Sequence, residues 1–191
     1  RAPRDTSRAA EPRQHAPASL PAHLDAVAKV DDTFETLRAR YGESAIRRAR
    51  LPAGEGGEYE GWILFPADPS RRIDVALDEA GVHPATLGVD APSAWRRADG
   101  VRIGMYLREL QALNGRPFEF AGFGWDYGGT VTDWKGGALG RGGPVPARVR
   151  LCAPDEVPSG YPTGDGAFMS DLPAVQSHPP VVCRFDAVPR R

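Results

Sequence analysis

The sequence predicts an α+β protein in which helices pack on one face of an antiparallel sheet. Two segments, residues 31–42 and 101–115, carry apolar residues at helical spacing, and each ends in glycine. Each is followed by short apolar segments that glycine and proline separate, a pattern typical of an antiparallel meander. Because helix and meander occur twice, we expect two tandem units, 30–100 and 101–191, unless the two form one continuous domain.

The helix of the first unit is expected over residues 31–42. Asp32 is a suitable N-cap, and Glu35 completes a capping-box pattern three residues later. The apolar face of this helix consists of Phe34, Leu37 and Tyr41. Gly42 then provides a left-handed stop.

Four strand-like segments follow the first helix. They cover residues 45–51, 60–66, 72–77 and 85–90. In the third segment, Ile73, Val75 and Leu77 alternate with polar or small residues, as expected for a strand with one buried face. The irregular turn after the fourth segment is expected to place Trp95 toward the core.

The second unit begins with a helix over residues 101–115, whose apolar side chains are Leu107, Leu110 and Leu113 and whose stop is Asn114-Gly115. Three strand-like pieces follow at 116–129, 130–137 and 147–153. Residues 153–180 resemble a loop with a short helix near 170–175, which Ser170 would cap. A closing strand, 181–188, should alternate Val182, Arg184 and Asp186 against Val181, Cys183 and Phe185.

The first 29 residues are rich in proline, alanine and arginine, and their only large aliphatic residues are Leu20, Leu24 and Val27. Such a segment buries too little apolar surface to offset the entropy lost on ordering. We therefore expect residues 1–29 to form a disordered tether with at most one short turn near 20–27. Because the chain begins on Arg1, this tether favours a processed, exported protein that was once attached to a signal or lipid anchor, with a cytosolic origin as the alternative.

The bulk composition argues against several function classes. The 191-residue chain has a formal net charge of −1, and its arginines are scattered among 25 acidic residues, so nucleic-acid binding is not expected. No run of 18 apolar residues is present, so the sequence predicts no membrane span. Without a CxxC motif or a Cys/His cluster, neither a zinc site nor any other cofactor is expected.

The two cysteines lie in strand-like segments. If these segments are neighbours, Cys152 and Cys183 could form a disulfide that closes a loop of about 30 residues. The alternative is a pair of buried free thiols that act as small apolar side chains. The sequence leaves both alternatives open.

The stretch FAGFGWDYGGTVTDW, residues 120–134, combines aromatic residues, glycines and two aspartates. We interpret it as a hairpin that covers a core, with Asp126-Tyr127-Gly128-Gly129 at its tip. In the rival interpretation, Trp125, Tyr127 and Trp134 form a stacking platform for a sugar or a peptide. Under the hairpin interpretation, the same tip contacts a partner as a secondary role.

A second candidate is the long loop of residues 158–171, which contains Tyr161, Phe168 and Met169. It is either a protruding binding loop or a surface loop held down by Tyr161 and Phe168. Calcium ligation by Asp165 and Asp171 lacks the spacing of a calcium-binding loop. The candidate binding residues of the chain are therefore Trp125, Asp126, Tyr127, Trp134 and Tyr161.

Enzymatic interpretations have little support in the sequence. None of the common nucleophile, metalloprotease or phosphate-binding motifs is present, and no histidine lies in a motif with a serine or cysteine. Asp126 with Asp133 or Glu119 could in principle form a carboxylate pair for glycoside cleavage. Acidic residues on a hairpin are usually solvated, so we expect no catalytic residues.

The second unit resembles a known module. Ile103 and the pair Gly104-Met105 lead into its helix, Gly115-x-Pro117 ends that helix, and Trp125-x-Tyr127 follows. This outline is similar to that of small outer-membrane assembly lipoproteins of the SmpA/OmlA type and of the secreted β-lactamase inhibitor protein. The likeness covers residues 101 to about 151, and 31–77 more loosely, since the first half has neither the Gly-Met pair nor the Gly-x-Pro exit.

The resemblance implies an exported two-layer α/β protein that binds other proteins through a concave sheet face and its loops, and no catalytic role comes with it. We therefore expect a periplasmic or secreted protein of the bacterial envelope that binds or inhibits another protein. A carbohydrate- or peptidoglycan-binding module is the alternative, and an envelope hydrolase is a third hypothesis.

Overall fold

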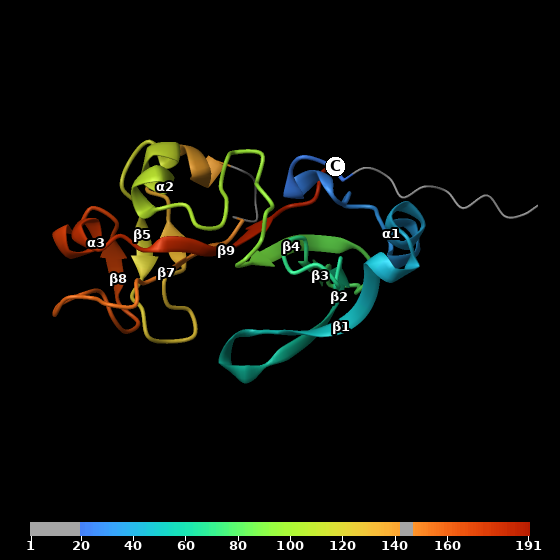
Figure 1. Cartoon of the computed structure of the whole chain (residues 1–191), viewed down its shortest axis with the longest axis horizontal. Coiled ribbons are helices and arrows are strands. Elements are labelled where there is room, and N and C mark those ends of the chain that lie inside the picture. The colour runs from blue at the N-terminus through green and yellow to red at the C-terminus, as the bar shows by residue number, and fades with distance from the viewer. Residues whose placement is uncertain (1–19, 142–146) are drawn as a thin grey trace, which may run out of the picture.

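The computed structural model describes residues 20–141 and 147–191 and is an α+β fold. All strand pairs within its two sheets are antiparallel (Figure 1). A six-stranded sheet has the order β1-β2-β3-β4-β9-β7, and a three-stranded sheet has the order β6-β5-β8. The predicted α+β class is therefore confirmed.

The elements fall close to the segments that the sequence predicts. The strands are β1 (Ile46–Pro52), β2 (Glu58–Leu64), β3 (Ile73–Leu77), β4 (Pro84–Asp90), β5 (Glu119–Ala121), β6 (Val131–Asp133), β7 (Val149–Cys152), β8 (Ala167–Met169) and β9 (Val181–Ala187). The α-helices are α1 (Phe34–Tyr41), α2 (Leu107–Asn114) and α3 (Pro173–Ser177). The 3-10 helices are η1 (Leu24–Ala26), η2 (Glu43–Ala45), η3 (Gly54–Gly56) and η4 (Ala138–Arg141).

The C-terminal strand joins the two halves of the chain. β1 to β4 form a continuous meander, and β9 pairs with β4 on one side and β7 on the other (Figure 1). Phe185 of β9 lies opposite both Val89 and Val149 and is fully buried. The strands of the second half are thus split between the two sheets, whereas β1 to β4 share one sheet.

The three-stranded sheet contains the expected hairpin. Glu119 and Phe120 of β5 pair with Asp133 and Val131 of β6, and the loop 122–130 connects them. The third strand, β8, lies in the segment that the sequence predicts to be a loop. A three-residue strand is too short to show periodicity, and its pairing with β5 comes from tertiary contact.

Both main helices differ in detail from the sequence prediction. Thr33, rather than Asp32, caps α1, and its side chain and that of Thr36 bond reciprocally to each other's backbone N–H. α2 begins at Leu107 instead of residue 101 because the preceding residues form turns, and it ends as predicted at Gly115 in the left-handed region (φ 77°). Gly42 also has a positive φ of 98°, although its ψ of 157° lies outside the left-handed helical region.

Ser170 is not the cap of the third helix. α3 follows Leu172, and Pro173 lies in its first turn. Backbone N–H groups in a first turn have no partner within the helix, so a residue without an N–H fits there. Ser170 is fully buried instead, and its hydroxyl accepts a hydrogen bond of 2.9 Å from the Phe118 N–H. The Ser170 hydroxyl thus provides a hydrogen-bond acceptor for a buried backbone N–H. If Ser170 capped α3 at the surface, this N–H would have no acceptor.

The described part of the expected tether is packed on the fold. Leu24, Val27 and Ala28 are fully buried, and the expected short turn is η1. The Leu24 N–H donates to the Arg96 carbonyl at 2.8 Å, and the Tyr41 hydroxyl donates to the Val27 carbonyl at 2.7 Å. Three buried aliphatic side chains with these tertiary partners are enough to order the segment, while residues 1–19 of the predicted tether lie outside the described residues.

Of the two alternatives that the sequence leaves open for the cysteines, the structure has the disulfide between Cys152 and Cys183, with an S–S bond of 2.07 Å. Cys183 occupies a β-bulge, since Arg150 faces Arg184 and Leu151 faces Val182, which leaves Cys183 without a direct partner. The bulge changes the predicted alternation, so that Val182 and Phe185 both enter the core. Arg184 and Asp186 still share one face, as predicted.

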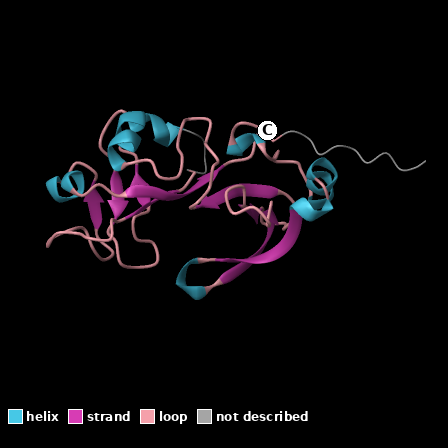
Figure 2. Ribbon diagram, viewed as in Figure 1, coloured by secondary structure: helices cyan, strands magenta, loops and turns pink. Residues whose placement is uncertain are grey.

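One apolar cluster joins residues of the helices and of the strands, whose arrangement Figure 2 shows. Leu37 of α1 and Leu110 of α2 belong to the same buried cluster as Trp62, Leu87 and Phe185 of the strands. Trp95 is buried as expected, and its indole N–H donates to the Arg71 carbonyl at 2.8 Å. Side chains that alternate with these core residues along the strands line a polar surface, which holds the candidate site.

Candidate functional site

Charged side chains form two cross-strand rows on the polar surface of the six-stranded sheet. Gly88 of β4 lies opposite both Asp74 of β3 and Asp186 of β9. In the next row, Arg184 of β9 lies opposite both Asp90 of β4 and Arg150 of β7. Residues directly opposite one another in antiparallel strands point to the same face, so the sheet register gathers these charges in one place.

An arch rises beside this surface. We call the arch the contact between the β1–β2 connection, at Gly54 and Glu55, and the loop 122–130, at Asp126 and Tyr127. Both segments extend from the sheets on the side away from α1 and α2 (Figure 1). The Glu55 N–H donates to the Asp126 carboxylate at 2.8 Å, and the Tyr127 ring lies against Gly54. The arch thus joins two segments that are 71 residues apart.

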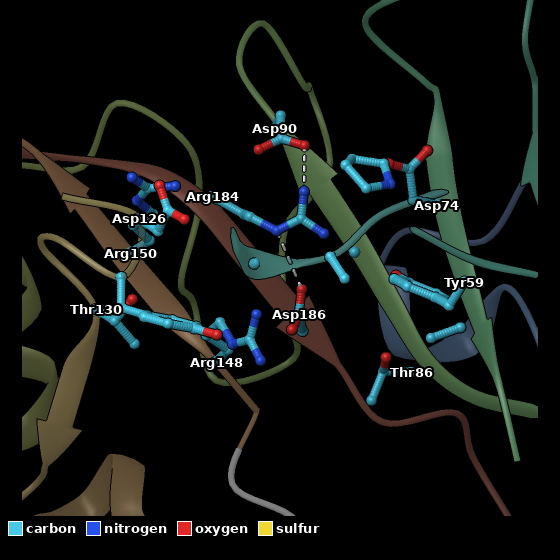
Figure 3. A pocket seen from close by; sticks show the side chains of 16 residues that line it. Tyr59, Asp74, Thr86, Asp90, Asp126, Thr130, Arg148, Arg150, Arg184 and Asp186 are labelled. Atoms are coloured by element: carbon cyan, nitrogen blue, oxygen red, sulfur yellow. Dashed lines mark hydrogen bonds and ion pairs between the residues drawn. The ribbon is translucent and has the colours of Figure 1, made fainter. Parts of the chain in front are cut away.

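A cavity of about 630 Å³ lies between the arch and the sheet (Figure 3). Its volume is within the range of about 300–1,000 Å³ that is usual for ligand sites. Most of its wall is polar, and its charged lining residues are Asp74, Asp90, Asp126, Asp186, Arg148, Arg150 and Arg184. Tyr59 and Tyr127 contribute aromatic rings.

Arg184 is held between two of the carboxylates. Its guanidinium lies 2.5 Å from Asp90 and 3.7 Å from Asp186, as the dashed lines of Figure 3 mark. A β-carbon on residue 88 would come within 2.7 Å of the Arg184 guanidinium and 2.9 Å of Asp186 Oδ1. Gly88 therefore provides the space in which the side chains of these two residues lie.

Asp186 is, with Asp74, one of the two buried acids of the cavity, and 9% of its surface is exposed. Its Oδ1 atom is buried and has no hydrogen-bond donor among the described residues. Burial raises the pKa of Asp186, and the nearby Arg184 and Arg148 only partly offset this effect. Burial likewise raises the pKa of Asp90 against the opposing effect of Arg184. Perturbed acids in a cavity are a common mark of functional sites.

The arginines from the β7 side complete the wall. The Arg150 Nε donates to the Gly128 carbonyl at 2.9 Å, which fixes this side chain beside the loop 122–130. Arg148 precedes β7 and lies beside Asp186, whose N–H donates to the Arg148 carbonyl at 2.8 Å. The Arg148 residue is exposed and lines the cavity. Guanidinium groups in this position present several N–H donors to a ligand.

Three of the five predicted binding residues lie in or beside the arch. Asp126 and Tyr127 line the cavity, while Trp125 packs edge-to-face on Tyr127 with ring centroids 5.3 Å apart. The exposed fractions of Trp125 and Tyr127 are 37% and 40%. The indole N–H of Trp125 donates to the Gly122 carbonyl at 2.8 Å, so one edge of this ring is fixed while the other remains exposed.

The other two predicted binding residues belong to the core. Trp134 packs on Phe118 with ring centroids 5.2 Å apart, and Tyr161 stacks on Phe123 at 5.6 Å. Both are less than a tenth exposed. Their expected position on the binding surface is therefore corrected, because each ring packs on a phenylalanine that lies just before or just after β5. The alternative for 158–171, a loop held down by Tyr161 and Phe168, agrees with these contacts.

The carboxylates considered for catalysis in the sequence do not come together. Glu119 and Asp133 both bind the Lys135 ammonium, at 2.8 and 3.0 Å, and neither lines the cavity that Asp126 faces. The two acids that share a contact with Arg184, Asp90 and Asp186, come from β4 and β9. Sequence reasoning missed them because only the pairing of these two distant strands makes them neighbours, although the polar alternation of Arg184 and Asp186 indicated an exposed strand face.

Within residues 20–141 and 147–191, no group of three or more His, Cys, Asp or Glu side chains is placed to hold a metal ion. In the same part of the chain, no helix is long and apolar enough to cross a membrane. No family model, curated protein or solved structure matches this chain significantly.

Proposed function

We propose that this chain is a non-catalytic binding protein of the bacterial envelope that captures or inhibits another protein through the arch. The observation that carries the proposal is the exposed ring pair Trp125 and Tyr127, held on a loop that is anchored at several points. Exposed aromatic side chains on an ordered frame are frequent anchors of protein interfaces. Because the loop is already ordered, less conformational entropy is lost on binding.

Three hydrogen bonds hold the loop 122–130, one from the β1–β2 connection and two from β7. Asp126 accepts the Glu55 N–H at 2.8 Å, Arg150 donates to Gly128, and the Leu151 N–H donates to the Gly129 carbonyl at 2.8 Å. A β-carbon on Gly129 would collide with the Leu151 carbonyl, so glycine permits the close approach to β7. These contacts support a preformed binding tip.

Export is part of the proposal. A disulfide persists in oxidising compartments, and the Cys152–Cys183 bond agrees with a periplasmic or secreted location. The resemblance to the SmpA/OmlA-type lipoproteins and the β-lactamase inhibitor protein stays a prediction and points to the same location and role. We also infer that the helices lie together on one face in two related helix-plus-meander units, which would leave the opposite face free for a partner.

Affinity capture from a bacterial envelope fraction, followed by titration with the purified captured protein, tests this function. Replacing both rings, Trp125→Ala with Tyr127→Ala, should abolish capture and leave the thermal unfolding midpoint nearly unchanged, because each ring is only partly buried. Tyr106→Ala is the matched control, since Tyr106 is 55% exposed and lines no part of the cavity. Capture that survives the double substitution, or is lost equally in the control, would refute the proposal.

A cell-wall polymer is the second candidate for the ring pair, favoured by the polar wall directly behind it. Pull-down with purified peptidoglycan separates the two functions of the ring pair, because protein capture predicts that Trp125→Ala is retained no less than the wild type. An envelope hydrolase is the third candidate, since the cavity contains several carboxylates. The shared contact of Asp90 and Asp186 with Arg184 favours binding over catalysis, because the guanidinium occupies the space between the two acids.

A further inference from the structure

We propose that the cavity beneath the arch is a separate binding site for a neutral polyhydroxylated ligand, that is, a sugar unit of an oligosaccharide. This site shares Tyr127 with the outer ring pair, but its other groups differ from that pair in position and chemistry. Its principal groups are Asp186, Arg184, Asp90 and Arg148, none of which the sequence indicated as binding residues. The proposal does not depend on capture of a protein by the arch.

The first argument is the charge balance of the cavity. Four carboxylates line it, those of Asp74, Asp90, Asp126 and Asp186, against the three guanidinium groups of Arg148, Arg150 and Arg184. Arg72, next to the cavity, forms an ion pair of 3.0 Å with Asp74 and balances the fourth carboxylate. Such a site offers many hydrogen-bond donors and acceptors, but its positive and negative charges nearly cancel. It therefore suits an uncharged polar ligand better than an ion.

The second argument is the unsatisfied acceptor at the centre of the site. Asp186 is nine-tenths buried and lines the cavity, yet its Oδ1 accepts no hydrogen bond from any described residue. A buried acceptor without a donor is costly and is usually satisfied by a ligand or an ordered water. Because Asp186 lines the cavity and the nearest guanidinium nitrogen of Arg184 lies 3.7 Å from its Oδ1, a ligand hydroxyl that enters beside Arg184 can donate to this carboxylate.

The third argument is the arrangement of donors and rings around this acceptor. Arg184 is fixed by Asp90, and Arg150 by Gly128, so their planar groups are oriented before a ligand enters. Fixed planar donors lose little entropy when they bond to hydroxyl groups. The rings of Tyr59 and Tyr127 provide apolar walls against which the C–H face of a sugar can pack.

An array of neutral oligosaccharides, followed by calorimetric titration with the strongest array ligand, tests the proposal. We expect saturable binding and a shift of the Gly88 amide signal in the NMR spectrum, with no shift of the Gly42 signal. Asp186→Asn should weaken binding roughly tenfold or more, because a hydrogen bond to a charged acceptor is lost. Asp165→Asn, an equal change of charge on an exposed loop, should leave the affinity unchanged.

A second variant tests the site without changing a buried residue, in case Asp186→Asn fails to fold. Arg148→Gln changes an exposed cavity donor and should also weaken binding without changing the unfolding midpoint. The proposal fails if no neutral oligosaccharide binds at about 10 mM, or if binding occurs without a shift at Gly88. It also fails if free arginine or glutamate binds in the cavity and the sugars do not, since the ligand would then be an ion. Loss of capture in Trp125→Ala, whose ring does not line the cavity, with sugar binding intact would separate this site from the arch.

Discussion

The ring of Tyr127 occupies the space that a β-carbon on residue 54 would need. Built on the backbone of Gly54, such an atom would collide with the Tyr127 hydroxyl and ring. The same contact brings Asp126 to the Glu55 N–H. The arch over the cavity therefore depends on a glycine in the β1–β2 connection, far in the sequence from the loop that it meets.

Gly54→Ala should separate the two sides of the arch. The added methyl group forces Tyr127 away, and the Glu55–Asp126 hydrogen bond is expected to break at a cost of about 1 kcal/mol. Hydrogen exchange of the Glu55 amide should accelerate, while amides of β2 keep their protection. Gly57→Ala is the control because its added β-carbon meets only ordinary contacts. Equal protection of Glu55 in both variants would contradict the arch.

Reduction of the disulfide should lower stability. The Cys152–Cys183 bond closes a loop with a sequence separation of 31, for which chain entropy predicts a loss of about 3.7 kcal/mol on reduction. Urea unfolding with and without a reducing agent measures the difference. The Cys152→Ser, Cys183→Ser double variant should match the reduced protein and show no response to the reductant. An unchanged midpoint would show that the bond contributes little.

Asp186→Asn should raise stability at neutral pH. Because burial raises the pKa of Asp186, the native state holds its proton to higher pH than the unfolded chain does. The free energy of unfolding therefore falls as pH rises from the ordinary pKa of 3.8 through the raised pKa of the native state. The Asp186→Asn variant lacks this loss, because asparagine does not titrate. Urea midpoints should favour the variant at pH 7 and converge with the wild type near about pH 3. A variant that is less stable at pH 7 would indicate a dominant attraction between Asp186 and the arginines.

Asp32→Asn should have the opposite pH dependence. Burial alone would raise the pKa of Asp32, but two hydrogen bonds from Arg40, at 2.6 and 2.7 Å, and one from the Lys29 N–H outweigh it, so the pKa is lowered. The stabilisation that the Asp32 carboxylate gains from these hydrogen bonds is present above the ordinary pKa of aspartate. It is lost as pH falls through the lowered pKa of Asp32 in the native state.

Breaking this pair should cost about 3 kcal/mol at pH 7, because Asp32 is nearly buried. Thermal or urea unfolding of the variant at pH 7 and at low pH measures the effect, and the difference from the wild type should shrink as pH falls. Asp31→Asn, next to it but exposed, should be nearly neutral at every pH. A pH-independent loss in Asp32→Asn would point to packing rather than charge.

Local patterns predicted the elements that local forces decide. The spacing of Leu107 and Leu110 with the stop at Gly115 predicts the end of α2 correctly, because side-chain periodicity and a positive φ are properties of neighbouring residues. The start of α2 was placed too early, since residues 101–106 form turns that tertiary contacts stabilise. One of these is the hydrogen bond of 2.8 Å from the Gly104 N–H to the Val182 carbonyl.

The candidate site was only half predictable. The sequence indicates a loop tip at Trp125, Asp126 and Tyr127, because aromatic residues lie among glycines there, and the structure places all three in or beside the arch. Trp134 belongs to the same pattern in sequence but is buried, since β6 ends where this ring can reach Phe118. Exposure of a ring depends on what lies across from it, and the sequence does not contain that information.

The sequence by itself determined the α+β class and the positions of the main helices and most strands, and it left the disulfide between the two cysteines as one of two alternatives. Only the tertiary structure decided that β9 lies between β4 and β7, which brings Asp90, Asp186 and Arg148 to one cavity under the arch. The physical reason is that strand pairing between distant segments depends on packing across the whole core, whereas helix periodicity and turn chemistry act over a few residues.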